Sequence, residues 1–225
     1  MSTQPLPQLN ELRCCSFNMH GLLNGLPMLQ TLCDNHEIIL LQEHWLHSHE
    51  LFRLSELFSD FNSYGISAMN DKLAAGILVG RPYGGVAIMW KKKLNFSMKV
   101  IAYDESGRYL AVMLNSDKKS FIIHCVYFPC YSSNVEYIVE VTNLISKIEL
   151  NLVNFPSAYH IIAGDFNFEC RVDIKSFDLL KNMLDRCNIF SCDSCNSSSL
   201  SLTYSIIMKV WSIGPELITF LLVVI

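Results

Sequence analysis

The stretch YHIIAGDFN (residues 159–167) joins an apolar run to two oxygen-bearing side chains. Its β-branched first half predicts a buried strand, and the Gly-Asp-x-Asn ending predicts that the strand stops there. Asp165 supplies a negative charge, and the amide of Asn167 can both donate and accept hydrogen bonds. Because Asp and Asn are also ordinary turn residues, this stretch indicates a site only if other parts of the chain repeat its design.

Two stretches nearer the N-terminus repeat this design. IILLQE (residues 38–43) is an apolar strand that leads into Glu43, and CCSFN (residues 14–18) is a short strand that ends in the amide of Asn18. Carboxylate and amide oxygens are ligands that hard cations such as Mg²⁺ prefer. We therefore expect the three strand ends to form one metal-binding or phosphate-binding site along a sheet edge.

The rest of the chain predicts a mixture of helices and strands. Amphipathic spacing predicts helices over residues 22–35, 49–59, 134–152 and 176–186. Runs rich in β-branched and aromatic residues predict strands over residues 37–41, 84–90, 100–103, 109–114, 121–128 and 159–163. Several strands follow one another in the middle of the chain, so an α/β or α+β sandwich of sheets flanked by helices fits best.

The composition indicates one globular domain. A chain of 225 residues can build one sizeable core, and a hydrophobic content of 51% with 17% charged residues excludes a disordered protein. The net charge of −4 gives no overall signature of a nucleic-acid-binding protein, although the field near a site can differ in sign from the total. We expect a polar tail over residues 1–12, a domain over 13–205 and an atypical apolar tail over 206–225.

Both ends of the chain bear on its location. The first 13 residues lack the apolar core of a secretory signal, and the nine cysteines are odd in number and irregularly spaced. These features favour reduced thiols in a nuclear or cytoplasmic protein that is not secreted. The apolar tail is shorter than the about 20 apolar residues of a membrane helix, and Lys209, Pro215 and Glu216 interrupt it. We therefore expect no membrane association.

The candidate site residues suit metal-assisted hydrolysis of a phosphodiester. This reaction needs a hard cation, a group that orients or activates water, and donors for the charge that develops on the phosphate. Glu43 is the best metal ligand, and Asp165 is the best base or second ligand. Asn18 and Asn167 can orient the phosphate or the water. Tyr127 lies at a predicted strand end, where its phenol could reach the same phosphate.

Five short motifs together resemble the endonuclease/exonuclease/phosphatase superfamily, and within it the endonuclease domains of non-LTR retrotransposons, which are related to AP endonucleases. They are SFNMHG (16–21), LLQEHW (40–45), GGVAI (84–88), VYFP (126–129) and IAGDFN (162–167). The likeness covers residues 13–205. It implies a four-layered α/β sandwich, cleavage of DNA phosphodiesters with Mg²⁺ or Mn²⁺, and a reverse transcriptase domain in the parent element.

The same resemblance gives each candidate residue a role. It implies that Glu43 is the metal ligand, with Asn18 beside it. Tyr127 is implied to be a catalytic tyrosine that contacts the phosphate. Asp165 and Asn167 are implied to position the attacking water and the phosphate.

The likeness weakens after Thr203, which by resemblance lies near the DNA. Such endonucleases continue to a further Asp and a terminal Ser-Asp-His, whereas here no histidine follows His160 and Glu216 is the one acid beyond Asp193. One freely chosen back-translation of residues 206–225 encodes an Asp-His segment in a shifted frame. We therefore interpret this tail as a frameshift or a mispredicted gene end, and we expect a sandwich that is incomplete at the C-terminus and a severely reduced activity.

Two other functions stay open at this point. One is a phosphatase of the inositol-phosphate or sphingolipid type on the same fold, and the other is a remnant that folds but performs no chemistry. The missing Asp and His favour the remnant. The GGVAI strand and the context of Tyr127 favour the nuclease.

Simpler interpretations apply to several of these residues. Asp165 and Asn167 could form an ordinary turn, and Tyr127 could be a core aromatic whose hydroxyl is satisfied. The four histidines at positions 20, 44, 47 and 49 show no zinc-binding pattern, so we expect them on the surface or beside helices.

Overall fold

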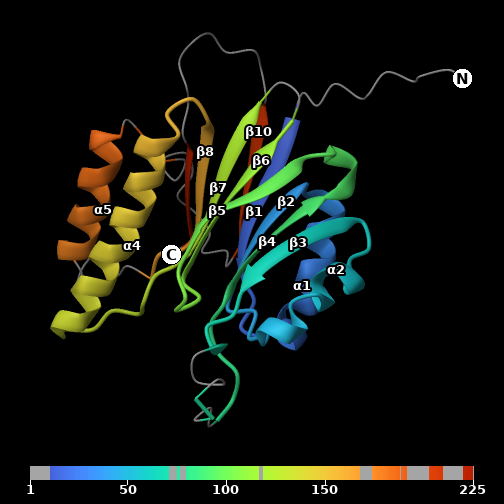
Figure 1. The fold of residues 1–225 in the computed structure, drawn as a ribbon, viewed down its shortest axis with the longest axis horizontal. Coiled ribbons are helices and arrows are strands. Elements are labelled where there is room, and N and C mark those ends of the chain that lie inside the picture. The colour runs from blue at the N-terminus through green and yellow to red at the C-terminus, as the bar shows by residue number, and fades with distance from the viewer. Residues whose placement is uncertain are drawn as a thin grey trace, which may run out of the picture.

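The computed structural model describes residues 11–70, 75–76, 80–116, 119–167, 174–187, 189–191, 203–209 and 220–224. In these residues two β-sheets pack face to face, and helices cover the outer face of each sheet (Figure 1). The layer order is helix, sheet, sheet, helix. This arrangement confirms the expected four-layered α/β sandwich.

The first sheet has the strand order β10-β1-β2-β4-β3. Its strands are β1 (Glu11–Asn18), β2 (Ile38–Gln42), β3 (Phe61–Ile66), β4 (Val86–Lys91) and β10 (Thr203–Lys209). β1 and β2 are parallel, and the other neighbours are antiparallel. Its outer face is covered by α1 (Leu22–Asn35) and by α2 (Arg53–Leu57), which follows the 3₁₀ helix η1 (Ser48–Glu50).

The second sheet has the strand order β5-β6-β7-β8-β11-β9. Its strands are β5 (Ser97–Tyr103), β6 (Tyr109–Asn115), β7 (Ser120–Tyr127), β8 (Tyr159–Asp165), β9 (Phe190–Ser191) and β11 (Phe220–Val224). A second 3₁₀ helix, η2 (Lys92–Leu94), precedes the antiparallel meander β5-β6-β7. α4 (Val135–Asn154) connects β7 to the parallel strand β8, and α5 (Ile174–Arg186) packs beside α4 over the same face.

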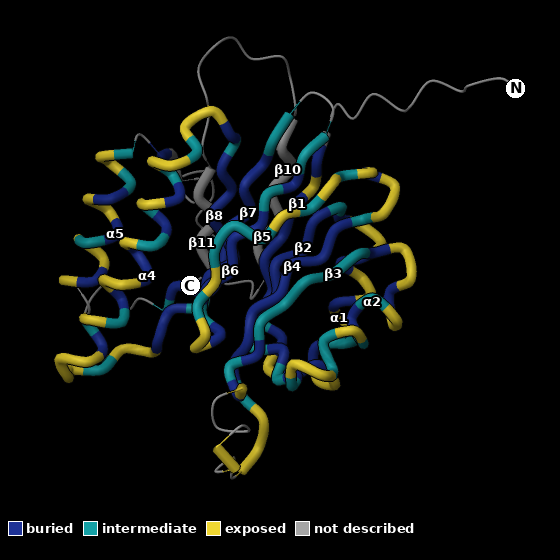
Figure 2. Tube along the Cα trace, in the orientation of Figure 1, coloured by how far each residue is buried: buried dark blue, intermediate teal, exposed yellow. Residues whose placement is uncertain are grey.

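The core has three parts, one between the two sheets and one between each sheet and the helices that cover it. Alternate side chains of β2, such as Ile38 and Leu40, meet Val112 and Ile123 from the second sheet. All five residues of β2 are buried, because α1 covers the other face of the strand (Figure 2). This double burial explains why β2 is a continuous apolar run rather than an alternating one.

Most element predictions are confirmed, and one helix prediction is wrong. The helix predicted over residues 22–35 has these bounds in the structure, and α4 and α5 lie within two residues of theirs. The helix predicted over 49–59 is instead η1 and the five-residue α2. Leu54 is fully buried, whereas Leu57 is 48% exposed, so the apolar stripe is too short to hold a longer helix. β3 was not predicted, since Asn62 and Gly65 disfavour strands.

The backbone after residue 202 contributes to both sheets. β10 pairs with β1 along its length, and β11 lies between β8 and β9. β10 crosses residue 205, where the sequence predicts the domain to end. The sequence predicts a sandwich that is incomplete at the C-terminus. In the structure, two segments of the chain after residue 202 are strands of the two sheets. The division into tail and domain stays a prediction.

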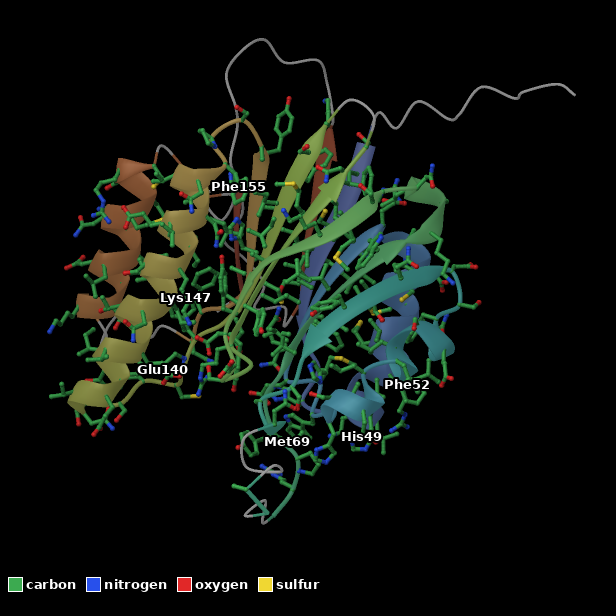
Figure 3. The ribbon with its side chains drawn as sticks, in the orientation of Figure 1. His49, Phe52, Met69, Glu140, Lys147 and Phe155 are labelled. Carbon is green, nitrogen blue, oxygen red and sulfur yellow. The ribbon has the colours of Figure 1, made fainter. Side chains whose placement is uncertain are left out.

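A buried chain of polar side chains joins α4 to the second sheet. His160 Nε2 lies 3.0 Å from the carbonyl of Phe155, at the end of α4 (Figure 3). His160 Nδ1 is 3.0 Å from His124 Nε2, and His124 Nδ1 is 2.9 Å from the Tyr109 hydroxyl, which accepts from Asn151 Nδ2 at 3.0 Å. A carbonyl can only accept, so His160 Nε2 donates to it, and one proton on each imidazole then satisfies every bond of this chain. Burial also lowers the pKa of both histidines, so we expect both to be neutral in the folded protein.

The stability of the fold is expected to fall as the pH drops from about 7.5 to about 5. Burial lowers the pKa of His44, His124 and His160, for His44 from 6.5 to about 4. The unfolded chain takes up protons below about pH 6.5 while the folded chain resists them, so stability is complete above this value and is lost as the pH falls. For His44 alone the difference corresponds to roughly 3 kcal/mol by about pH 4.

Urea unfolding at several pH values between about 5 and 7.5 measures this loss, since most carboxylates stay ionised in this range. The exposed His49 gives the matched control. His49→Asn, a change at the surface, should leave the loss of stability that comes from the buried histidines in place. Equal stability at both ends of the range would contradict the assignment of neutral buried histidines.

None of the helices in the described parts of the chain is both long enough and apolar enough to cross a membrane.

Candidate active site

Four strands end at the same edge of the sandwich. In the first sheet the parallel strands β1 and β2 end together, because Asn18 is paired with Gln42 and Glu43 follows at once. In the second sheet the parallel strands β7 and β8 end together, because Tyr127 is paired with Asp165. The carboxyl ends of parallel strands form the usual site edge of an open α/β sheet. Each sheet thus brings two of the predicted residues to this edge.

Hydrogen bonds across the sandwich join these pairs. Asn18 Nδ2 donates to Asp165 Oδ2 at 2.8 Å. The Tyr127 hydroxyl donates to Glu43 Oε1. Each bond links a residue of the first sheet to one of the second sheet. The structure therefore brings Asn18, Glu43, Tyr127 and Asp165 into one cluster, as the sequence predicts.

Asn167 lies beside this cluster and holds two strand ends together. Its backbone N–H donates to Asp165 Oδ1 at 3.1 Å, and its Nδ2 donates to the carbonyl of Phe128 at 2.8 Å. Its φ of +49° is in the left-handed region, which Asn tolerates better than most residues. The predicted contact of Asn167 with substrate stays a prediction, whereas its positioning of Asp165 is visible in the structure.

The backbone around Glu43 is also unusual. His20, Glu43 and Trp45 have φ values of +46°, +53° and +58°. Non-glycine residues in this region carry a conformational cost, and such residues concentrate at functional sites. The Gly21 N–H donates to the carbonyl of Glu43 at 2.8 Å, which fixes the loop after β1 against the loop after β2.

The surroundings of Asp165 raise the pKa of its carboxyl group above the value of an aspartate in water. Asp165 is only 8% exposed, and this burial raises the pKa of its carboxyl group above the ordinary value, with a further contribution from the negative charge of Glu43. The hydrogen bonds from Asn18 and Asn167 act in the opposite direction. Asp165 is therefore a stronger base than an ordinary aspartate, which suits the acceptance of a proton.

Tyr127 keeps its proton in this site. Burial raises the pKa of its hydroxyl, and the hydrogen bond to Glu43 and the charge of Glu43 raise it further. The ring is held by Arg108, whose guanidinium lies 5.1 Å from the ring centroid and whose carbonyl accepts the Tyr127 N–H. Arg108 in turn forms a 2.6 Å ion pair with Glu140, which projects from α4 (Figure 3). Tyr127 is thus a fixed hydrogen-bond donor.

Two residues beside Glu43 were not predicted as site residues. His20 Nδ1 lies 3.4 Å from Glu43 Oε2, and Trp45 Nε1 donates to the same oxygen at 3.3 Å. The Trp45 ring also lies under the guanidinium of Arg81, 5.4 Å from its centroid. Their positions in the sequence could have indicated that they belong to the site, because His20 is two residues after Asn18 and Trp45 is two residues after Glu43.

A buried polar link lies beneath the cluster. Ser16 Oγ donates to Gln42 Oε1 at 3.1 Å, and Gln42 Nε2 lies 3.3 Å from the thiol of Cys125 in the second sheet. All three residues are fully buried. A glutamine inside an otherwise apolar strand was the sequence signal for this link, which ties the two sheets together directly below Glu43.

The structure corrects the prediction for His44 and leaves that for Thr203 open. His44 is fully buried rather than on the surface, because its Nδ1 accepts the Leu46 N–H and its Nε2 donates to the carbonyl of Ile66. Thr203 begins β10 and is paired with Phe17, one residue before Asn18. The backbone thus brings Thr203 beside the cluster, but its side chain lies outside the described part of the structure.

Gly85→Ala is expected to destabilise the protein by roughly 1–3 kcal/mol more than Gly76→Ala. Both glycines have a positive φ, +88° for Gly85 and +67° for Gly76. A Cβ on Gly85 would lie 2.4 Å from the buried ring of His44, whereas a Cβ on Gly76 would meet no atom of the described residues within 4 Å. Urea unfolding of both variants measures the difference, and equal losses would show that the His44 ring can move aside.

The donor set at this edge fits a hard divalent cation. Among the described residues, no group of three or more His, Cys, Asp or Glu side chains is arranged to hold a metal ion. Mg²⁺ needs no such group, since it keeps several waters and is commonly bound through one or two carboxylates and the substrate's phosphate. The carboxylate of Glu43 and the amide oxygen of Asn18 therefore fit Mg²⁺ better than Zn²⁺.

The comparisons with known proteins agree with this arrangement. The model of the endonuclease/exonuclease/phosphatase family matches residues 15–182, which include Asn18, Glu43, Tyr127, Asp165 and Asn167. The chain therefore belongs to the endonuclease/exonuclease/phosphatase family. A search of curated proteins found no match.

Several solved structures share the fold. The AP endonuclease LMAP from Leishmania major superposes with a TM-score of 0.60 at 15% identity, over 80% of this chain and 67% of that one. The human Nocturnin catalytic domain with bound sulfate has a TM-score of 0.57 at 13% identity, over 91% and 83%. The 3′ phosphatase NExo from Neisseria, bound to a product DNA hairpin, has a TM-score of 0.53 at 16% identity, over 76% and 71%. At these identities the likeness establishes the fold alone.

Proposed function

We propose that this chain is a Mg²⁺-dependent phosphodiester hydrolase that nicks DNA, derived from the endonuclease domain of a non-LTR retrotransposon. The observation that carries the proposal is the joining of four strand ends by the Asn18–Asp165 and Tyr127–Glu43 hydrogen bonds. Family membership supports phosphodiester hydrolysis, and the DNA product bound by the Neisseria relative supports DNA as substrate. The five sequence motifs support the retrotransposon origin.

Each residue of the site has its own role in hydrolysis. Asp165 accepts a proton from the attacking water, which its raised pKa favours. Asn18 and Asn167 hold the Asp165 carboxylate in place through the Asn18 amide and the Asn167 N–H. The Tyr127 hydroxyl, which donates to Glu43 in this structure, would turn its one hydrogen toward the charge that develops on the phosphate. Glu43, together with Asn18, would hold Mg²⁺, which when bound neutralises negative charge on the phosphate.

Conversion of supercoiled plasmid to open circles tests this function. With enzyme in excess and Mg²⁺ present, open circles should accumulate, and EDTA should stop their formation. A parallel assay should follow phosphate release from inositol phosphates and the hydrolysis of sphingomyelin. Hydrolysis of either of these without nicking would replace the nuclease by the phosphatase alternative.

A non-catalytic remnant is the second candidate, and one observation favours it. Within these 225 residues no histidine follows His160 and Glu216 is the one acid after Asp193. Loss of one group that stabilises transition-state charge costs about 10²–10³ in rate. We therefore propose a weak rather than an abolished activity, and fast nicking would show that this cost is overstated.

The tail after Thr203 has its own test. We propose that a frameshift or a mispredicted gene end produced residues 206–225, and that a reverse transcriptase followed in the parent element. The nucleotide sequence decides this directly. An alternative frame that encodes an Asp-His strand and leads into a reverse transcriptase reading frame would support the proposal, and its absence would refute it.

A further inference from the structure

We propose that His20 is a third protein ligand of the cation, beside Glu43 and Asn18, and that its nitrogen raises the affinity of the site for Mn²⁺ and other cations that accept nitrogen ligands relative to its affinity for Mg²⁺. This inference rests on the proposed function only in that Glu43 binds a divalent cation. The inference does not require hydrolysis, so an experiment can refute it without refuting the proposed function.

The spacing of the two side chains fits a shared cation. His20 Nδ1 and Glu43 Oε2 are 3.4 Å apart, which slightly exceeds the about 2.7–3.2 Å of an ordinary N–H···O hydrogen bond, as does the 3.3 Å contact of Trp45 Nε1 with the same oxygen. Two ligand atoms at about 2.1–2.2 Å from one ion, with an angle of about 90–110° between them, stand about 3.0–3.6 Å apart. The observed separation lies in this second range.

The backbone of His20 is fixed before any ligand arrives. Its N–H donates to Asn18 Oδ1 at 3.2 Å, and its carbonyl accepts from Asn24 Nδ2 at 2.8 Å. The next residue, Gly21, donates to the Glu43 carbonyl. A ligand whose backbone is already held loses little conformational entropy on binding. His20 is therefore prepositioned against Glu43 itself.

The exposure of the pair also fits. The side chain of His20 is 61% exposed and that of Glu43 is 16% exposed, so the imidazole stands at the solvent side of a largely covered carboxylate. A cation arriving from solvent can contact both atoms without moving the sheets. Imidazole suits Ni²⁺ and Zn²⁺ best, and Mn²⁺, a first-row transition-metal ion, accepts it more readily than Mg²⁺, which is bound almost wholly by oxygen. The pair should thus discriminate between these ions.

Isothermal titration calorimetry with Mg²⁺ and Mn²⁺, at about pH 7.5 where histidines are largely neutral, tests the proposal. His20→Asn is the informative variant, because Asn tolerates the left-handed φ of +46° and adds no nitrogen ligand. It should weaken Mn²⁺ binding by about tenfold or more and change Mg²⁺ binding by less than about twofold. Circular dichroism checks that the variant is folded.

Two further variants sharpen this experiment. His49→Asn is the matched control, because His49 lies exposed in η1 (Figure 3). Among the described residues, its ring stacks on that of His47 alone. It should leave binding of both ions unchanged. Trp45 donates to Glu43 Oε2, so cation binding should also change its fluorescence, and Trp45→Phe should remove that signal.

The outcomes separate this inference from the proposed function. Equal weakening of Mg²⁺ and Mn²⁺ binding by His20→Asn, or no weakening of either, would overturn the role of His20 as a ligand. Loss of Mn²⁺ preference in a protein that binds cations but nicks no DNA would support the inference and count against the nuclease. DNA nicking by a protein whose Mn²⁺ affinity does not depend on His20 would support the nuclease and overturn the role of His20 as a ligand.

Discussion

Glu43→Gln is expected to lower the rate of Mg²⁺-dependent plasmid nicking by about a hundredfold or more. The amide keeps the size of the side chain and can still accept the Tyr127 hydrogen bond. It removes the negative charge that holds the cation, which is the strongest interaction a hard divalent ion has with this site. The loss should therefore appear in the chemistry rather than in the fold.

The measurement is single-turnover nicking with enzyme in excess, which detects even a weak activity. Glu56→Gln is the matched control, because Glu56 is an exposed carboxylate in α2. Its rate should equal that of the unaltered chain. A Glu43→Gln variant that nicks at an undiminished rate would remove Glu43 from the metal site.

Asp165→Asn is expected to reduce nicking by a comparable factor, of order 10²–10⁴ for loss of a general base. Asn keeps the size of the side chain and can accept from Asn18 Nδ2, but its amide nitrogen cannot accept from the Asn167 N–H, so one of the two bonds that hold this side chain is lost. The Asn amide cannot act as the base that takes a proton from the attacking water. Asp178→Asn, an exposed change in α5, controls for the substitution itself.

The pH dependence of the rate gives a second measure of Asp165. The pKa of this carboxyl is raised, so the carboxylate form is lost at a higher pH than for an ordinary aspartate as the solution is acidified. Nicking should therefore fall with decreasing pH before the ordinary aspartates titrate. A rate that stays constant down to about pH 4 would exclude Asp165 as the base.

The positions of the candidate residues could be predicted from the sequence because strand ends are local features. The runs before Glu43 and Asp165 are apolar and β-branched, and each stops at a polar side chain. A parallel pairing then suffices to bring such ends together. The hydrogen bond between Tyr127 and Glu43 was not predictable in this way, because it depends on how two separate sheets pack against each other.

The histidines show a second limit of sequence reasoning. His44 follows Glu43 in an apolar context, yet its burial depends on the carbonyl of Ile66 and on the absence of a side chain at Gly85. His20 contacts Glu43 because the loops after β1 and β2 both adopt left-handed backbone, at His20 in the first and at Glu43 and Trp45 in the second. Neither feature has a period or a spacing along the chain. They depend on contacts between segments that are distant in sequence.

The central claim is that Glu43 and Asp165, from different sheets, act in one site on one phosphodiester. A double-mutant cycle of Glu43→Gln and Asp165→Asn in single-turnover nicking tests it most directly, since residues that act as a unit give strongly non-additive losses. The account predicts that the double variant is no slower than the slower single variant. Losses that multiply, as for two independent sites, would contradict it.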